Sequence, residues 1–308
     1  MASMSERELV WYVGQDFEPN KETYEYYKTQ YVRFKKATRK ILLVSYGSGG
    51  VLATHPKENL CATLCKKLSV TARSLYMLAP DPNSKEFFQQ HLDFTSSATI
   101  ARALVSNFAM LYHFGIEACS EDEFRTRQLL MWWRDYRVRR KMNFAEGYRE
   151  RADAFHDPDL RRRLNENKFW LRLPDKTRRH ILRSNHLLHS EEEILERAGA
   201  DKETHIKMYA YWSAHAHCDS VSFINMDEQR RGSGQVNVGD IAMLGTTLEW
   251  INGFLEHAAK EVDDIFAGAE ERASKIKNLD LLSNKTVSMP WAGKLTLEQA
   301  RENYRKTK

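Results

Sequence analysis

Five residues in one short stretch have side chains that could do chemistry: Tyr209, Ser213, His215, His217 and Asp219. Residues four apart lie on the same face of a helix, so Ser213 pairs with His217 and His215 pairs with Asp219. Polar groups that are buried together need hydrogen-bond partners. The spacing therefore indicates either a buried polar network or a site.

Three kinds of chemistry fit this stretch. Histidine binds metals, but His215 and His217 are two residues apart and point about 200° away from each other on a helix. One ion would therefore need ligands from another helix, for which the sequence offers His186, His189 and Glu249. A Ser213 nucleophile with His217 as its base would lack an identified third member. The structural alternative is a network in which His217 bonds Ser213 or a tyrosine, and we expect no metal or cofactor.

We define the polar centre as the four residues that this network would unite, which are Arg102, Tyr209, Ser213 and His217. Small or polar residues recur along the face that carries Ser213 and His217. We expect both side chains to point inward, near Arg102 or a tyrosine of its helix. Whether such a centre is structural or functional stays open at this level.

A second pattern joins Arg183 and His189, which are separated by five residues. It matches the loose arginine–histidine spacing of HEPN ribonucleases, in which histidine acts as general base or acid on the 2′-hydroxyl and arginine stabilises the phosphorane charge. Arg179 and His186 fit the pattern equally well. Because HEPN sites are usually built across a dimer, this alternative implies a homodimer with Arg183 and His189 on one exposed helix face. The other interpretation is a basic amphipathic helix.

Positive charge is concentrated in the middle of the chain. The formal net charge is +5, yet residues 134–183 alone hold sixteen Lys and Arg against eight Asp and Glu. This excess favours an anionic partner, with nucleic acid as one candidate. The anion-binding residues we expect are Arg161, Arg162, Arg163, Arg178 and Arg179. The neighbouring Trp132, Trp133 and Trp170 could stack on bases, but we expect them to pack in the core.

The elements that carry these residues are predicted to be helices. Glycine (14) and proline (7) are scarce, and apolar residues recur at helical spacing, so we expect an all-α, multi-helix bundle with long antiparallel helices. Capping boxes at Ser120 and Ser190 mark two helix starts. The helices are expected at 22–46, 57–79, 94–114, 121–144, 202–224 and 240–277, with shorter pieces between 145 and 189. We divide the chain into an N-terminal helical segment (1–82), a helical core domain (83–277) and a C-terminal tail (278–308).

Composition places this protein among soluble, cytoplasmic proteins. No run of about 18 apolar residues predicts a membrane span, and the polar N-terminus lacks the apolar core of a secretory signal. The four cysteines lack zinc spacing and are expected to be reduced. The glycine run at 47–50 lacks the Lys-Ser/Thr ending of a phosphate-binding loop, so no nucleotide cofactor is expected.

Three stretches resemble the bacterial domain-of-unknown-function family 5677. They are Ile100–Val105, Arg125–Met142 and the Tyr209-x-x-x-Ser213-x-x-x-His217 spacing. The resemblance covers roughly residues 90–260 and implies an all-helical bundle without an established activity. That family often carries a glutamate four residues after the early arginine, where this chain has Ser106. A distant likeness to HEPN bundles is an analogy of fold.

Two functions follow as hypotheses. The first is an uncharacterised binding or regulatory module whose basic face contacts an anionic partner. The alternative is a metal-independent ribonuclease of HEPN type in a microbial defence or toxin system. Whether the chain is an enzyme is left open, and the first hypothesis is favoured because neither histidine pattern is a complete catalytic constellation.

Overall fold

The computed structural model is built from helices. It describes residues 21–49, 51–141, 157–184, 187–224, 232, 234–276 and 281–282, and the predicted tail therefore lies almost wholly outside them. Within the described residues there is no β-strand, only an isolated bridge between His91 and Gln235. The prediction of an all-α, multi-helix protein is confirmed.

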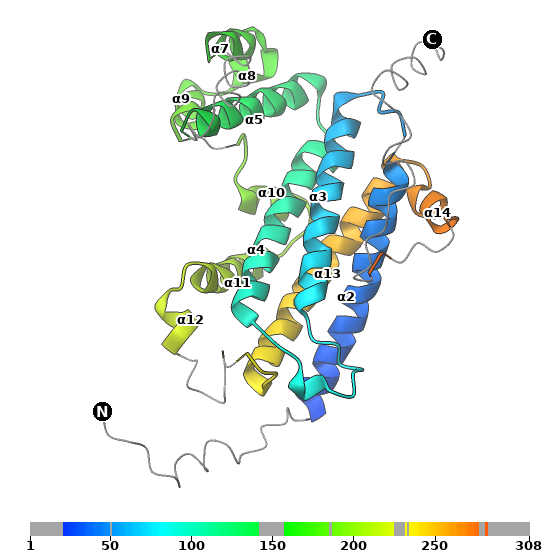
Figure 1. Ribbon diagram of the computed structural model, residues 1–308. Coiled ribbons are helices and arrows are strands. Elements are labelled where there is room, and N and C mark those ends of the chain that lie inside the picture. The colour runs from blue at the N-terminus through cyan, green and yellow to red at the C-terminus, as the bar shows by residue number, and fades with distance from the viewer. Residues whose placement is uncertain are drawn as a thin grey trace.

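Four long helices form the main bundle, which Figure 1 shows along its length. They are α2 (Lys21–Ser48), α3 (Pro56–Leu78), α4 (Phe94–Leu111) and α13 (Val238–Ile265). Ten further helices among the described residues complete the fold. They are η1 (Phe87–Gln89), η2 (Tyr112–Ile116), α5 (Glu121–Lys141), α7 (Asp157–Glu166), α8 (Lys168–Arg172), α9 (Asp175–Ser184), α10 (Glu191–Arg197), α11 (Lys202–Ala216), α12 (Ser220–Ile224) and α14 (Ala269–Ser274).

The bundle is antiparallel only in part. Helices α2, α3 and α4 alternate in direction, as expected for consecutive helices joined by short connections. Helix α13 instead runs parallel to α2. Tyr26 Oη donates to Glu249 Oε2 at 2.8 Å, and about two turns further along both helices Arg33 Nη2 binds Glu256 Oε2 at 2.6 Å. The intervening helices return the chain to the end of the bundle at which α2 begins.

One core runs through the whole bundle. Tyr27 and Phe34 of α2, Leu68 of α3, Leu104 of α4 and Leu248 of α13 are all fully buried in the same cluster. Burying a large apolar side chain contributes about 1.5–3 kcal/mol, so these contacts hold the four helices as one body. The division predicted at residue 82 does not separate two cores, because α2 and α3 bury their apolar faces against α4 and α13.

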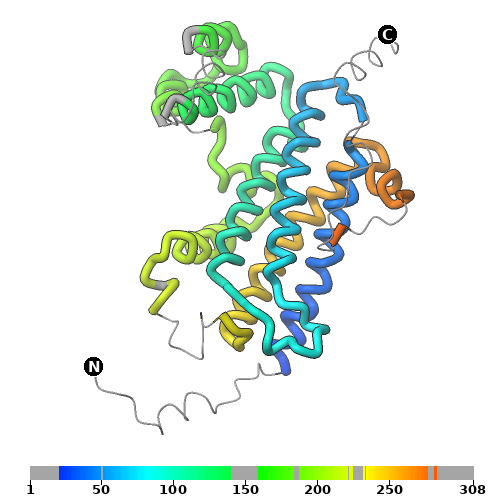
Figure 2. The backbone as a smooth tube through the Cα atoms, in the orientation of Figure 1, coloured from blue at the N-terminus to red at the C-terminus, as the bar shows by residue number. Residues whose placement is uncertain are grey.

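A second unit, which we define as helices α5, α7, α8 and α9, has its own core. Figure 2 shows it at the end of the bundle where α4 finishes. Its buried residues are Leu129, Leu130, Trp133, Tyr136, Leu160, Leu164, Trp170 and Ile181. Trp133 and Trp170 pack inside this unit, as the sequence suggested. Trp132 is only partly buried against it.

Two helices end earlier than predicted. The helix expected at 202–224 stops at Ala216, because Cys218 takes a left-handed conformation (φ 52°) and the chain restarts as α12. The helix expected at 240–277 stops at Ile265, and Gly268 (φ 81°) turns the chain into α14. Both breaks use a positive φ to reverse direction, which periodicity alone does not reveal.

The two predicted capping boxes have different outcomes. At the start of α10, Ser190 and Glu193 bond each other's backbone amides, so this box is complete. At the start of α5, the Glu123 amide donates to the Ser120 hydroxyl at 3.2 Å. The Glu123 carboxylate pairs with Arg127. The Glu123 side chain therefore neutralises a buried arginine of α5.

In the part of the chain that the structure describes, no helix combines the length and the apolar character that crossing a membrane requires.

Substitution of Gly47 tests the close contact between α2 and α14. A Cβ atom on Gly47 would overlap the backbone carbonyl of Ala269, whereas one on Gly253 would meet nothing within 4 Å. We expect Gly47→Ala to lower the free energy of unfolding by about 1–3 kcal/mol through overpacking. Gly253→Ala is the matched control and should raise it by about 0.5–1 kcal/mol through helix propensity. Urea titrations of both variants check this, and equal effects would contradict the close approach.

Candidate functional site

The predicted polar centre forms between α4 and α11. Arg102 donates from Nη2 to Tyr209 Oη at 2.9 Å, and its Nη1 lies 3.1 Å from His217 Nε2. The guanidinium carbon also lies 4.8 Å from the centre of the Tyr209 ring, which is a cation–π distance. Because a guanidinium can only donate, His217 Nε2 accepts and the ring hydrogen is on Nδ1. The structure thus brings together three of the four predicted residues.

Glu191, which the sequence did not single out, joins this centre. It lies at the start of α10, is partly buried and interacts electrostatically with Arg102. Burial raises the pKa of Glu191, while the Ser106 hydrogen bond and the Arg102 charge act in the lowering direction. Ser106 stands where the family resemblance expects a glutamate. The carboxylate near Arg102 in this chain is instead that of Glu191, which comes from another helix.

The fourth predicted residue, Ser213, is positioned by helix spacing. It stands one turn after Tyr209 and one turn before His217. Its Oγ is buried and makes no hydrogen bond among the described residues. His205, one turn before Tyr209, is 2% exposed, and its ring lies 5.6 Å from the Tyr209 ring. Burial lowers the pKa of His205.

His215 belongs to the core. Its ring lies 5.0 Å from Phe94 and 4.8 Å from Tyr211, and its Nδ1 is 3.4 Å from the Thr95 hydroxyl. The expected shared face with Asp219 is wrong, because α11 ends before residue 219. Asp219 instead accepts from the Ser220 amide at 2.6 Å in the following turn.

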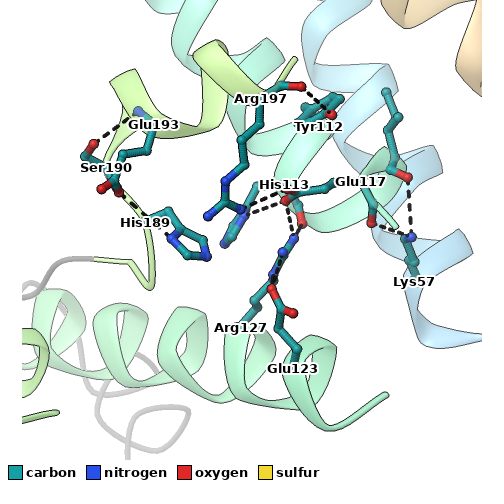
Figure 3. A network of polar contacts seen from close by, with 11 residues as sticks. Lys57, Tyr112, His113, Glu117, Glu123, Arg127, His189, Ser190, Glu193 and Arg197 are labelled. Atoms are coloured by element: carbon teal, nitrogen blue, oxygen red, sulfur yellow. Dashed lines mark hydrogen bonds and ion pairs between the residues drawn. The ribbon is translucent and has the colours of Figure 1, made fainter. Parts of the chain in front are cut away.

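A second polar cluster, absent from the sequence predictions, joins the second unit to the bundle (Figure 3). Arg127 on α5 has a side chain only 1% exposed, which binds Glu117 Oε2 at 2.7 Å, the His113 carbonyl at 2.5 Å and the Glu123 carboxylate. Arg197 on α10 binds Glu117 Oε1 at 2.8 Å. We call these five residues the arginine joint.

The joint depends on a π-helical turn, η2, at the end of α4. Its Tyr112 carbonyl accepts from the Glu117 amide at 2.8 Å, and this wider turn places the His113 carbonyl opposite Arg127. π-Helical turns are rare and occur frequently at functional sites. The His113 ring lies 5.5 Å from the His189 ring, at 88° to it. The structure therefore sets two histidines beside two arginines.

Electrostatics hold these groups in defined charge states. Burial by itself raises the pKa of Glu117, but hydrogen bonds from His113 and Arg197 and the charge of Arg127 lower it to about 2. Burial, then the charges of Arg197, His113 and Arg127, lower the pKa of His189 to about 4. Burial also lowers the pKa of His113. Near neutral pH the Glu117 carboxylate therefore lies between two arginines, and the imidazoles of His113 and the neighbouring His189 are neutral.

The structure separates Arg183 from His189. Arg183 lies exposed in the last turn of α9, and its carbonyl accepts from Arg137 Nη1 at 3.2 Å. His189 lies beyond the end of that helix, beside His113 of the arginine joint, with a side chain 21% exposed. The expectation that both share one helix face is wrong, because α9 ends at Ser184. His186, the other histidine considered, lies outside the described residues.

The predicted anion-binding arginines are all in the second unit, and carboxylates of the same helix engage several of them. Arg162 binds Asp159 at 2.6 Å and Glu166 at 2.8 Å, and Arg178 binds Asp175. Two others lie over aromatic rings, Arg161 4.9 Å from the Trp133 ring and Arg163 5.5 Å from the Trp132 ring. Arg179 is exposed and donates to the Asp175 carbonyl at 3.4 Å.

One signal could have identified the arginine joint. Arg127 stands three residues after Phe124 and three before Leu130, which are buried on the inner face of α5. A charged residue on an apolar stripe must be paired when the helix is packed. No signal in the sequence identified Glu117 as its partner, because the π-helical turn sets that side chain's direction.

Among the described residues, no group of three or more His, Cys, Asp or Glu could hold a metal ion. No family model, no curated protein and no solved structure matches this chain.

The lowered pKa of His189 predicts a pH dependence of stability. The unfolded histidine titrates near pH 6.5 and the folded one near 4, so between these values the unfolded chain binds more protons. The stabilisation is fully present above about pH 6.5 and is lost as pH falls toward 4. Its size is on the order of 3 kcal/mol.

Urea titrations at several pH values check this on wild type and His189→Gln. The variant should lose less unfolding free energy than wild type between pH 6.5 and 4. Parallel profiles of the two proteins would contradict the assignment. Glu117 begins to lose its contribution below about pH 4.5, but it does so in both proteins, so its titration cancels in the comparison.

Proposed function

We propose that this chain is a cytoplasmic helical binding module that takes single-stranded RNA on a basic face of its second unit. The proposal depends on a group of positively charged side chains that no carboxylate of the described residues neutralises. Four exposed cations of α8 and α9 make no ion pair with any described residue, and they are Lys168, Arg172, Lys176 and Arg183. We call these four, with Arg179, the basic face.

The spacing of these cations suits a row of phosphates. Lys168 and Arg172 are one turn apart on α8. Lys176, Arg179 and Arg183 follow one another at three and four residues and so share a face of α9. Exposed lysine and arginine neutralise backbone phosphates and release their counterions, which drives binding without reading sequence.

The burial of the tryptophans supports RNA binding through charge and not through base stacking. Trp133 and Trp170 are 3% and 1% exposed, so a nucleic acid base cannot stack on either ring. Their role is to fix the helices that present the cations. Arg162 and Arg163 of α7 already pair with carboxylates of the same helix, and Arg161 lies over the Trp133 ring. We therefore assign the main contact to the basic face and not to α7.

The test changes the basic face and leaves the paired arginines in place. A quadruple Gln variant of Lys168, Arg172, Lys176 and Arg183 should lose at least about tenfold in affinity for single-stranded RNA. Wild-type affinity should fall steeply with added salt, and the variant's salt slope should be shallower by about three units, at about 0.7 for each cation removed. Fluorescence anisotropy with a labelled oligonucleotide measures both.

Arg162→Gln is the matched control, because its charge is already compensated by Asp159 and Glu166. It should change RNA affinity much less than the quadruple variant, and both variants should melt within a few degrees of wild type. Binding by wild type that is undetectable at low salt, or equal in the quadruple variant, would refute the proposal.

A second candidate function is the metal-independent ribonuclease, now with a different arginine. His189 is partly exposed and its lowered pKa keeps the imidazole neutral, as a general base requires. Arg197, whose side chain is 36% exposed, is the nearby cation that could stabilise a phosphorane. On this proposal two chains would form a homodimer around one RNA groove.

The ribonuclease proposal makes opposite predictions for the two arginines. RNA cleavage should persist in EDTA and vanish in His189→Ala, while Arg197→Ala should lower it about 100-fold to 1,000-fold. Arg183→Ala should leave the rate nearly unchanged, because Arg183 lies on α9, away from the joint. Melting curves identify any variant that has lost its fold. A digest unaffected by His189→Ala would exclude this candidate without touching the RNA-binding proposal.

A further inference from the structure

We infer that the polar centre binds a phosphate group, as an anion site distinct from the basic face of the second unit. The site is built from Arg102 of α4, from Tyr209 and Ser213 of α11, and from His217 just beyond the end of α11. This inference rests on the direction of the hydrogen bonds inside the centre, and it does not depend on the proposed RNA binding.

The bonds within the centre use acceptors and leave donors free. Arg102 donates to both Tyr209 Oη and His217 Nε2. The Tyr209 hydroxyl hydrogen and the His217 Nδ1 hydrogen therefore remain to be satisfied. A guanidinium carries five N–H groups, and these two bonds use only two of them. The centre thus offers several donors around one positive charge.

Ser213 adds a hydroxyl group that has no hydrogen-bond partner among the described residues. Its Oγ is buried and bonds no described residue, although it lies on the helix face between Tyr209 and His217. A buried hydroxyl without a partner costs free energy, so this helix face carries a donor that its neighbours leave unsatisfied. Two oxygens or more on the ligand are needed to serve Tyr209 and His217 together.

The centre is open to solvent on one side. His217 is exposed and Arg102 is half-buried, at the end of α11 where the chain turns through Cys218. A ligand can approach His217 and Arg102 from this side without the bundle opening. Partial burial strengthens charge-assisted bonds relative to those made on a fully exposed surface.

Glu191 sets the strength of the site and provides its sharpest test. Its carboxylate interacts with Arg102, and its Oε1 is buried without a hydrogen-bond partner among the described residues. Ionised Glu191 opposes an anion, whereas protonated Glu191 becomes another donor. We therefore expect weak binding, in the millimolar range, that improves when the charge of Glu191 is removed.

Phosphate fits better than a carboxylate. A phosphate monoester offers three acceptor oxygens and about −1.5 to −2 charges near neutral pH, which matches several donors around one arginine. A carboxylate has two oxygens and one charge. Free phosphate and the phosphate of a nucleotide share this chemistry, and the experiment distinguishes them.

The experiment titrates the full chain with inorganic phosphate, adenosine 5′-monophosphate and acetate, each at constant ionic strength. Binding is read from the NMR signals of the His217 ring and from calorimetry. Wild type should bind inorganic phosphate with one site, and Arg102→Gln should weaken it at least about tenfold. Tyr209→Phe, which removes only a hydroxyl, should weaken it about threefold to tenfold.

Two controls separate this site from the others. Glu191→Gln should tighten phosphate binding by at least about threefold, and Arg125→Gln, an exposed arginine of α5, should leave it unchanged. The quadruple variant of the basic face should keep phosphate binding at the His217 ring. If it loses RNA binding and keeps phosphate, the two proposals are independent, as we infer.

Three results would overturn the inference. The first is no response of the His217 ring to phosphate at low millimolar concentration. The second is a response that persists in folded Arg102→Gln and Tyr209→Phe. The third is equal affinity for acetate and phosphate, which would assign the centre to carboxylates. Tighter binding of the nucleotide would extend the site to its sugar and base, and equal binding would limit it to the phosphate group.

Discussion

The buried guanidinium of Arg127 is the constraint on which the arrangement of the two helical units depends. A charge removed from water requires opposite charge and hydrogen bonds, and breaking such a pair costs about 3–5 kcal/mol. Arg127 finds both in Glu117, Glu123 and the His113 carbonyl. The bonds to Glu117 and His113 cross from α5 to the end of α4. The second unit is thereby attached to the bundle by directional bonds as well as by apolar contact.

Glu117 extends this constraint to α10. One carboxylate oxygen serves Arg127 and the other serves Arg197, while Tyr112 Oη donates to the Arg197 carbonyl at 3.0 Å. Helix α10 has only seven residues, and its other end places Glu191 at the polar centre. A single short helix thus connects the arginine joint to the polar centre. A shift of α10 would be felt at both clusters.

The two anion sites that we propose differ in physical character. The basic face is exposed, so its attraction for phosphates is strong at low salt and is screened as salt is added. The polar centre is partly buried, with fewer charges and fixed donors, so its selectivity comes from hydrogen-bond geometry. Arginine suits the second role because its planar group can hold Tyr209 and His217 while it faces a ligand.

The sequence by itself determined the helices and the faces that they present. Helix formation depends on local hydrogen bonds and side-chain spacing. For this reason, most ends of the long helices lie within a few residues of their predicted positions. The spacing also placed Tyr209 and His217 near each other, and both contact Arg102. His217 is nevertheless exposed, just beyond the end of α11, where we expected its side chain to point inward. The exceptions, at Cys218 and Gly268, are positions where a left-handed residue breaks a continuous apolar pattern.

Only the tertiary structure decided which charges meet. Glu191 reaches Arg102 from a helix almost ninety residues away, and Glu117 faces Arg127 because a π-helical turn redirects it. Helix α13 runs parallel to α2 because the chain between them returns to its starting end, which no local pattern encodes. Long-range pairing depends on how all the apolar faces close around one core. Residue spacing describes the face of each helix separately and does not determine which faces pack against each other.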